Sequence, residues 1–277
     1  MTRMLSQTRH GAFALLVLVV APLAVLQAQE TPRMPDGRPD LSGYWLRAGA
    51  GVTAGIDEAG DVALTLPARD NDIANFEKDF SVMERSHPNK PLYKPEYWDQ
   101  IQDLDWNGLT ADPVFSCKPA GVPRIGSPHK IVQTSTEIVL MYDAVVNRGP
   151  AEYRVIPLDG RDHLPVQIND TSWLGYGVGH WEGDTLVIES VGFNNESWLA
   201  WPGYIHSWDM TVTERLRREG DELHWEATVT DDTMLLEPWM MEPIVSRLNT
   251  NPDAFFFGEV PCEERDAEHI VDQNVRG

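Results

Sequence analysis

The sequence predicts a mainly β fold, in which antiparallel strands close or nearly close into a barrel behind an irregular N-terminal cover. After Asp112-Pro113, short apolar and β-branched runs follow one another, and turn sequences rich in Gly and Asp separate them. No helical runs alternate with these strand candidates, which argues against a parallel sheet. No segment of fixed length repeats, which argues against a propeller or a solenoid. Many short strands without either feature are typical of an antiparallel barrel of the lipocalin type.

The first 28 residues have the parts of an export signal. Arg3 and Arg9 supply positive charge, residues 12–26 are apolar, and Leu26-Gln27-Ala28 fits a small-residue cleavage site. An apolar helix of that length spans about 22 Å, whereas a membrane core is roughly 30 Å thick. We therefore expect residues 1–28 to be a cleaved signal peptide rather than an anchor. The mature chain is expected to be periplasmic or secreted, with no membrane association.

The chain is strongly acidic, with a formal net charge of -21 at pH 7. A charge of that sign repels nucleic-acid phosphates and anionic lipid surfaces. We therefore expect no nucleic-acid partner. The sequence leaves the oligomeric state open.

Residues 29–111 are expected to form an irregular lead-in and cover. Residues 29–40 are rich in Pro and charge, residues 41–45 look like a first short strand, and residues 62–66 alternate as a strand does. Residues 68–106 are polar and interrupted by prolines, which is typical of short helical turns laid over another element. A lid and a structural cover both fit this composition, and the structural cover is the commoner case.

Residues 112–277 are expected to form the barrel domain, as one structural unit with the cover. Turn sequences containing Gly160, Gly183 and Gly220 end or join its strand candidates. The candidates are Ile131–Gln133, Glu137–Tyr142, Glu152–Pro157, Tyr176–Trp181, Thr185–Glu189, Met210–Arg217 and Glu222–Thr230.

Glu214 stands on an otherwise apolar strand face. Period-two alternation places Met210, Val212 and Leu216 on the same face. Burying a lone carboxylate is costly, so this group must be paired or have a raised pKa. A buried ion pair with an arginine is the favoured interpretation, and a pKa-shifted acid or base is the alternative.

The two cysteines of the chain, Cys117 and Cys262, are expected to form a disulfide. An isolated pair in an exported protein most often does so. Closing a loop of that length contributes roughly 4 to 5 kcal/mol in the chain-entropy view. A metal site and a catalytic thiol are the alternatives, but neither cysteine has a Cys or His partner at ligand spacing.

Several short motifs together resemble a broad group of exported proteins of environmental bacteria. They are Pro35-Asp36-Gly37-Arg38-Pro39-Asp40-Leu41-Ser42-Gly43-Tyr44-Trp45, Asp112-Pro113, Cys117-Lys118-Pro119-Ala120-Gly121-Val122-Pro123-Arg124, Asp159-Gly160-Arg161-Asp162-His163, Trp181-Glu182-Gly183-Asp184-Thr185 and His206-Ser207. The resemblance covers nearly the whole mature chain and implies export and a β-rich domain, but it transfers no activity. Members of the group often have Ser in place of Gly177, and His-Ser-Glu where this chain has His206-Ser207-Trp208-Asp209.

No metal site is predicted, although a divalent metal is an open alternative. The chain has no HxH, HxxxH or HExxH spacing, so three or four ligands would have to converge from separate strands. His163, His180 and His206 are the histidines from which such a site would be drawn.

Acid–base chemistry is the favoured interpretation of the polar residues. His206 with Asp209 nearby offers an imidazole that a carboxylate could hold near neutral pKa. Arg161 or Arg215 would stabilise an anion, and the further candidates for proton transfer are Glu214 and His163. A backbone-bonded loop histidine is the structural alternative. A Ser207-based triad is disfavoured because the chain has no G-x-S-x-G element.

Tryptophans crowd into residues 172–231, together with these polar candidates. Core packing is the default role for each one. Large aromatics in a loop call for another reason, and we expect them to form a rim or pocket wall. The predicted wall consists of Trp173, Trp181, Trp201, Trp208 and the neighbouring His180.

These observations favour an exported enzyme that acts by acid–base chemistry, as a lyase, hydratase, isomerase or hydrolase. Its substrate would be an uncharged or aromatic small molecule in a Trp-lined barrel pocket. A lipocalin-like binding protein without catalysis is the first alternative. Carbohydrate recognition by a row of surface tryptophans is the second.

Overall fold

The structure, a computed structural model, describes residues 30–47, 53–56, 62–65, 89–106, 111–143, 151–200, 203–254 and 256. The predicted signal peptide, Trp201 and Cys262 lie outside these ranges. Within them, no helix combines the length and the apolar character needed to span a bilayer. The disulfide between Cys117 and Cys262 therefore stays a prediction.

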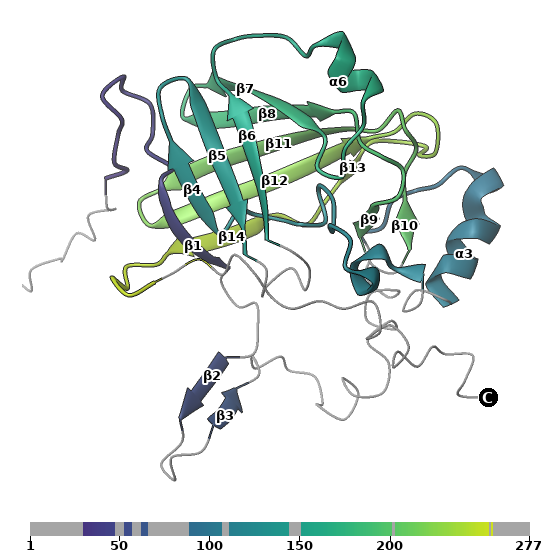
Figure 1. Cartoon of the computed structure of the whole chain (residues 1–277), viewed down its shortest axis with the longest axis horizontal. Coiled ribbons are helices and arrows are strands. Elements are labelled where there is room, and N and C mark those ends of the chain that lie inside the picture. The colour runs from purple at the N-terminus through teal and green to yellow at the C-terminus, as the bar shows by residue number, and fades with distance from the viewer. Residues whose placement is uncertain are drawn as a thin grey trace, which may run out of the picture.

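One curved antiparallel sheet dominates the described part of the chain (Figure 1). Its continuous path has the strand order β6-β5-β4-β1-β14-β12-β11-β8-β7, and β13 pairs with β12 beside that path. The strands are β1 (Gly43–Arg47), β4 (Lys130–Gln133), β5 (Glu137–Tyr142), β6 (Glu152–Pro157), β7 (Tyr176–Glu182), β8 (Thr185–Val191), β11 (Thr211–Glu219), β12 (Glu222–Thr230), β13 (Trp239–Met240) and β14 (Ile244–Leu248). Two hairpins lie outside this sheet, β2 (Thr53–Ile56) with β3 (Val62–Thr65) and β9 (Trp198–Ala200) with β10 (Tyr204–Ile205).

The strands follow one another around the cylinder in chain order. From β1 the order runs through β4, β5 and β6, then β7, β8, β11, β12 and β14, which pairs back onto β1. In that closing ladder Trp45 lies opposite Leu248. The path of described strands is hydrogen bonded except between β6 and β7. The predicted antiparallel barrel is therefore confirmed, as a nearly closed one.

Side chains that alternate inward along each strand fill the barrel. On β11 and β12 every second residue is buried, including Val212, Leu216, Leu223 and Trp225. Burying one large apolar side chain contributes roughly 1.5 to 3 kcal/mol. The interior is thus a packed core, and a ligand site has to be sought at an end or an edge.

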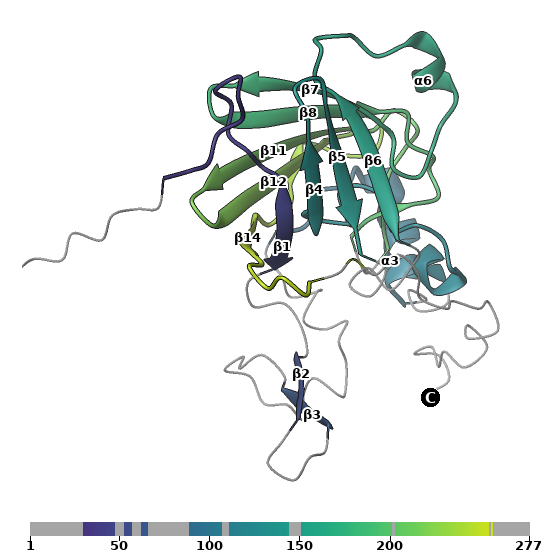
Figure 2. The ribbon, with the colours of Figure 1, turned by 60° about the vertical axis from the view of Figure 1, so that its left-hand side comes forward.

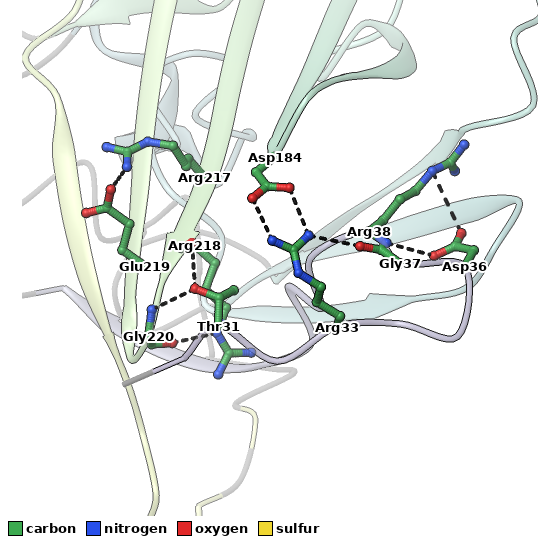
Figure 3. Close-up of polar contacts among 10 residues, drawn as sticks. All are labelled: Thr31, Arg33, Asp36, Gly37, Arg38, Asp184, Arg217, Arg218, Glu219 and Gly220. Atoms are coloured by element: carbon green, nitrogen blue, oxygen red, sulfur yellow. Dashed lines mark hydrogen bonds and ion pairs between the residues drawn. The ribbon is translucent and has the colours of Figure 1, made fainter. Parts of the chain in front are cut away.

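The lead-in, residues 30–41, closes one end of the barrel by binding two hairpin turns (Figure 3). Arg33 donates two hydrogen bonds to the Asp184 carboxylate, in the β7–β8 turn, at 2.9 and 2.8 Å. Thr31 Oγ1 accepts a hydrogen bond from the Gly220 N–H, in the β11–β12 turn, at 3.0 Å. Leu41 is completely buried at the end of this segment. This part of the expected cover therefore packs against the hairpin turns at one end of the barrel.

The opposite end carries residues 89–106, with the 3-10 helix η1 (Pro95–Tyr97) and the helix α3 (Trp98–Trp106). Tyr93 is buried there, and its hydroxyl donates to the Ile205 carbonyl, in β10, at 2.7 Å. Figure 1 shows α3 beside the β9–β10 hairpin, and Figures 1 and 2 both show α3 far from the lead-in. The lead-in and residues 89–106 thus lie at opposite ends of the barrel.

Candidate functional site

The gap between β6 and β7, which we call the seam, is the feature that sets up the candidate site. All neighbouring strands along the described path are antiparallel, and the path contains nine strands. Its first and last strands, β6 and β7, therefore run in the same direction. Residues 158–175, which include the short helix α6 (Pro165–Asn169), carry the chain back between them. The two strands consequently cannot close the barrel with an antiparallel ladder.

Two glycines allow side chains of the β6 side to seal one part of the seam. A Cβ at Gly177 would lie 2.7 Å from Ile156 Cδ1, and a Cβ at Gly179 would lie 2.6 Å from Leu158 Cδ2. Such contacts are shorter than packed carbon atoms allow, so Ile156 and Leu158 lie directly on the β7 backbone. Packing closes this part of the seam where hydrogen bonds do not.

Beyond the sealed part, the seam opens into a pocket of about 400 Å³. Residues 152–157, the whole of β6, form one wall, and residues 172–177 form the other. Its volume lies within the range of small-molecule sites. The lining residues that matter for its chemistry are Glu152, Tyr153, Arg154, Gln167, Trp173 and Tyr176.

Glu152 lines this pocket and has a carboxyl pKa that is shifted toward neutral pH. It is half-buried, and desolvation raises the pKa of its carboxyl from 4.5 to about 7. Both protonation states are therefore populated near neutral pH, which is the condition for efficient proton transfer. Trp173 and Tyr176 supply aromatic surface in the same pocket.

Arg154 follows Glu152 by two residues on the same face of β6, and its side chain is buried inside the barrel. Its side chain pairs with Glu214 on β11, with 2.6 Å between Nη1 and Oε2, and both residues are almost completely buried. Burial opposes the charge of Arg154, but the Glu214 carboxylate and the Tyr142 hydroxyl raise its pKa overall. The favoured prediction for Glu214, a buried ion pair with an arginine, is confirmed.

Three further residues complete this interior network. Arg154 Nη2 donates to Ser190 Oγ at 2.8 Å, and Arg154 Nη1 donates to the Tyr142 hydroxyl at 3.2 Å. Trp225 Nε1 donates to Glu214 Oε1 at 3.0 Å. Burial raises the pKa of Tyr142 to about 12, so this phenol stays neutral. The network ties the seam strand β6 across the barrel to β5, β8, β11 and β12.

His206, the residue predicted to act as acid or base, is enclosed by the protein. It is 3% exposed, its Nε2 lies 2.8 Å from Ser197 Oγ, and its Nδ1 lies 2.8 Å from the Ser207 carbonyl. The carbonyl fixes the proton on Nδ1, so Nε2 accepts from the Ser197 hydroxyl. Burial lowers the pKa of His206. These contacts match the structural alternative for this residue, a backbone-bonded histidine.

The expected partner of His206, Asp209, is engaged elsewhere. Asp209 is exposed, and its Oδ2 accepts from the Thr233 hydroxyl at 3.0 Å. The buried carboxylate of this region is Asp231, which accepts from the Ser207 N–H at 2.6 Å and from the Ser207 hydroxyl at 2.9 Å. The His206 ring thus bonds to Ser197 and the Ser207 carbonyl rather than to Asp209, and Asp231, which the chain brings to this loop after β12, binds Ser207.

The remaining predicted polar residues are not brought together with His206. His163 Nε2 lies 3.0 Å from the carbonyl oxygens of Tyr176 and Glu189, so it fastens the α6 connection to the sheet. Arg161 lies in an exposed ion pair with Asp159, and Arg215 in one with Glu182. His180 is exposed, and its Nε2 lies 3.5 Å from Glu182 Oε1. Among the described residues, no group of three or more His, Cys, Asp or Glu is placed to hold a metal ion.

The predicted tryptophan wall is divided among different environments. Trp173 lines the seam pocket. Trp181 is half-buried against the core, and Trp208 is 55% exposed. Trp201 lies outside the described residues.

Sequence reasoning missed the two charged residues of β6 that face inward. Glu152 and Arg154 alternate with exposed residues and share a face with the buried Ile156. The same alternation argument that singled out Glu214 applies to this strand. Applied there, it would have predicted Arg154 as a buried charge in need of a partner.

Comparisons of the chain with protein-family models, with curated proteins and with solved structures find no match. The resemblance to exported bacterial proteins therefore stays an expectation. The chemistry of the seam pocket is left as the guide to function.

Proposed function

We propose that the protein is an exported enzyme that acts on an uncharged, partly aromatic small molecule in the seam pocket, with Glu152 as the acid–base group. The observation that carries this proposal is that Glu152, which is half-buried and has a pKa of about 7, lines a pocket of about 400 Å³. The aromatic faces of Trp173 and Tyr176 favour a flat apolar group on the ligand. A protonated Glu152 donates a hydrogen bond to that ligand, and an ionised one accepts its proton.

The first test is a screen for molecules that bind, read by protein NMR shifts at Trp173 and Tyr176. Each hit is then incubated with wild-type protein, Glu152→Gln and Glu137→Gln, and the ligand signals are followed. Glu137 is an exposed carboxylate on β5 outside the pocket lining, so its variant is the matched control. We expect the wild type and the control to convert the ligand, and Glu152→Gln to bind it without converting it. Equal conversion by all three proteins contradicts the assignment of Glu152.

Ligand binding without catalysis is the second candidate. It is favoured by the ion pair between Arg154 and Glu214, because Arg154 is the other charged residue among the described lining residues and is engaged inside the barrel. In that case the hits persist unchanged with wild-type protein, and Glu152→Gln changes only the pH dependence of their affinity.

A further inference from the structure

The Glu152 carboxyl lines the seam pocket without a protein partner of its own. In the part of the chain that the structure describes, no group donates a hydrogen bond to it or pairs with its charge, and burial alone shifts its pKa. The side chain is half-buried, so the remaining half is hydrated through the pocket. A ligand that fills the pocket removes this water and must offer the carboxyl a hydrogen-bonding group in return.

The charges around the pocket favour an uncharged ligand. Arg154 is the other charged residue among the described lining residues, and its guanidinium pairs with Glu214 inside the barrel. The net charge of -21 repels anions. A permanent cation would have to be desolvated together with an ionised Glu152, which costs more than desolvating a neutral pair. A neutral ligand facing a protonated Glu152 avoids both costs.

A protonated Glu152 selects for a basic acceptor atom on that ligand. The carboxyl has a pKa of about 7, so its protonated form is present at neutral pH and donates one O–H. Such a bond strengthens as it takes on ionic character, which a more basic acceptor gives it. The pyridine-type nitrogen of an aromatic ring is neutral, flat and weakly basic. Trp173 and Tyr176 supply faces on which such a ring stacks, also when it carries a share of the proton.

We propose that the ligand of the seam pocket is a nitrogen heteroaromatic weak base. Its ring nitrogen accepts a hydrogen bond from Glu152, and its ring lies against Trp173 and Tyr176. The inference rests on the proposed function in taking the seam pocket as the ligand site, and it names the substrate class. The pocket volume of about 400 Å³ leaves room for a fused two-ring system.

The shared proton gives this binding a characteristic pH dependence. Affinity falls above about pH 7, where Glu152 loses its proton, and falls again at low pH, where the ring nitrogen takes up a proton of its own. The described titratable groups on the neighbouring part of β5, on β6 and at the opposite wall are Tyr142, Asp143, Tyr153, Arg154, Tyr176 and His163, which contacts the Tyr176 carbonyl. All of them are retained in a Glu152 variant, so that variant isolates the contribution of Glu152.

Benzimidazole and indazole test the basic nitrogen. The two molecules are isomers of nearly the same shape, both are mainly uncharged at neutral pH, and indazole is the far weaker base. Affinity is measured by calorimetry, and the site is located by NMR shifts at Trp173 and Tyr176. We expect wild-type protein to bind benzimidazole about tenfold more tightly than indazole at neutral pH. Equal affinities, shifts confined to other residues, or no binding of either isomer would overturn the inference.

A permanent cation tests the preference for a neutral ligand. Benzyltrimethylammonium carries an aromatic ring and a positive charge at every pH, and it has no acceptor nitrogen. We expect it to bind wild-type protein more weakly than benzimidazole at neutral pH, because its charge and that of Glu152 are then desolvated together. Tighter binding of this cation, with affinity that only rises as the pH rises, would reject the weak base in favour of a cationic ligand.

Two carboxyl variants test the role of Glu152. Glu152→Gln keeps the size and a hydrogen-bond donor but has no proton that it can release. We expect this variant to bind the two isomers about equally and to lose the fall in benzimidazole affinity above neutral pH. Glu137→Gln, outside the pocket lining, should keep both the preference and the pH profile. A preference for benzimidazole that persists in folded Glu152→Gln would overturn the inference.

Two tryptophan variants test where the ring lies. Trp173→Leu removes an aromatic face of the pocket and should weaken both isomers about three- to tenfold, with the preference for benzimidazole unchanged. Trp208→Leu is the matched control, because Trp208 is exposed and lies outside the pocket lining. If both folded variants bound the isomers as the wild type does, the stacked ring, and with it the inference, would be refuted.

Binding and conversion separate this inference from the proposed function. A preference for benzimidazole that depends on Glu152 supports the inference even when no ligand is ever converted and the proposed catalysis fails. Conversion of a screening hit that depends on Glu152, with equal affinities for benzimidazole and indazole, supports the proposed function and rejects the ligand class.

Discussion

At the residue scale, Glu152 connects the pocket to the stability of the free protein. Its folded pKa of about 7 lies above its ordinary value of 4.5, so the folded state holds this proton more tightly than the unfolded state. The contribution is therefore fully present at low pH and is lost as the pH rises from about 4.5 through 7. We expect Glu152→Gln to flatten the fall in stability between pH 5 and 8, measured by urea unfolding. Glu137→Gln should keep the wild-type profile, and an unchanged profile in Glu152→Gln would place Glu152 in open solvent.

The ion pair between Arg154 and Glu214 is the second residue-scale prediction. Removing one partner leaves the other charge buried and uncompensated, so Glu214→Gln should cost about 3 to 5 kcal/mol. The double variant Arg154→Met with Glu214→Leu should recover much of that loss, because both charges are then gone. Thermal and urea unfolding of the three variants measure this. If Arg154→Met alone matched the double variant, the coupling between the two residues would be refuted.

The same residues show how far sequence reasoning reaches at this scale. Glu214 was predictable as a buried, paired carboxylate, because its apolar strand face leaves few alternatives. Asp209 was predicted as the partner of His206 from proximity in sequence, which does not place side chains in a loop, and in the structure its carboxylate accepts from Thr233. Asp231 reaches this loop only after the β11–β12 hairpin brings the chain back.

At the element scale, strand patterns were predictable wherever alternation is strong, as on β5, β11 and β12. β14 was missed, because its burial follows from pairing with both β1 and β12 and not from an alternating pattern of its own. The seam was not predictable either. The seam arises because the path contains an odd number of strands, so that its first and last strands run in the same direction. A prediction that misses one strand, such as β14, gives the wrong parity.

The glycines of β7 give the element-scale prediction. A Cβ at Gly177 meets Ile156 Cδ1 at 2.7 Å and Ile188 Cγ2 at 3.0 Å. Gly177→Val should therefore push β6 away from β7 and cost about 1 to 3 kcal/mol. His180→Val, on the exposed face of the same strand, is the control for a change in strand propensity. Urea unfolding of both variants measures the difference, and equal stability would show that the seam is looser than this packing implies.

At the scale of the whole molecule, the ladder between β1 and β14 moves the weak point of the barrel away from the first and last described strands of the chain. In an open sheet, the first and last strands of the chain would fray first. Here the first and last strands of the described sheet, β1 and β14, pair with each other, and the edges without a described strand partner belong to β6 and β7, in the middle of the sequence. We expect native-state hydrogen exchange to be fast at Tyr153, Val155 and Gly177. Exchange at Trp45 and Leu248 should instead approach the slow rates of β11 and β12, which are paired on both sides. Fast exchange along β1 and β14, with slow exchange at the seam, would mean that the cylinder closes between β6 and β7 and opens between β1 and β14.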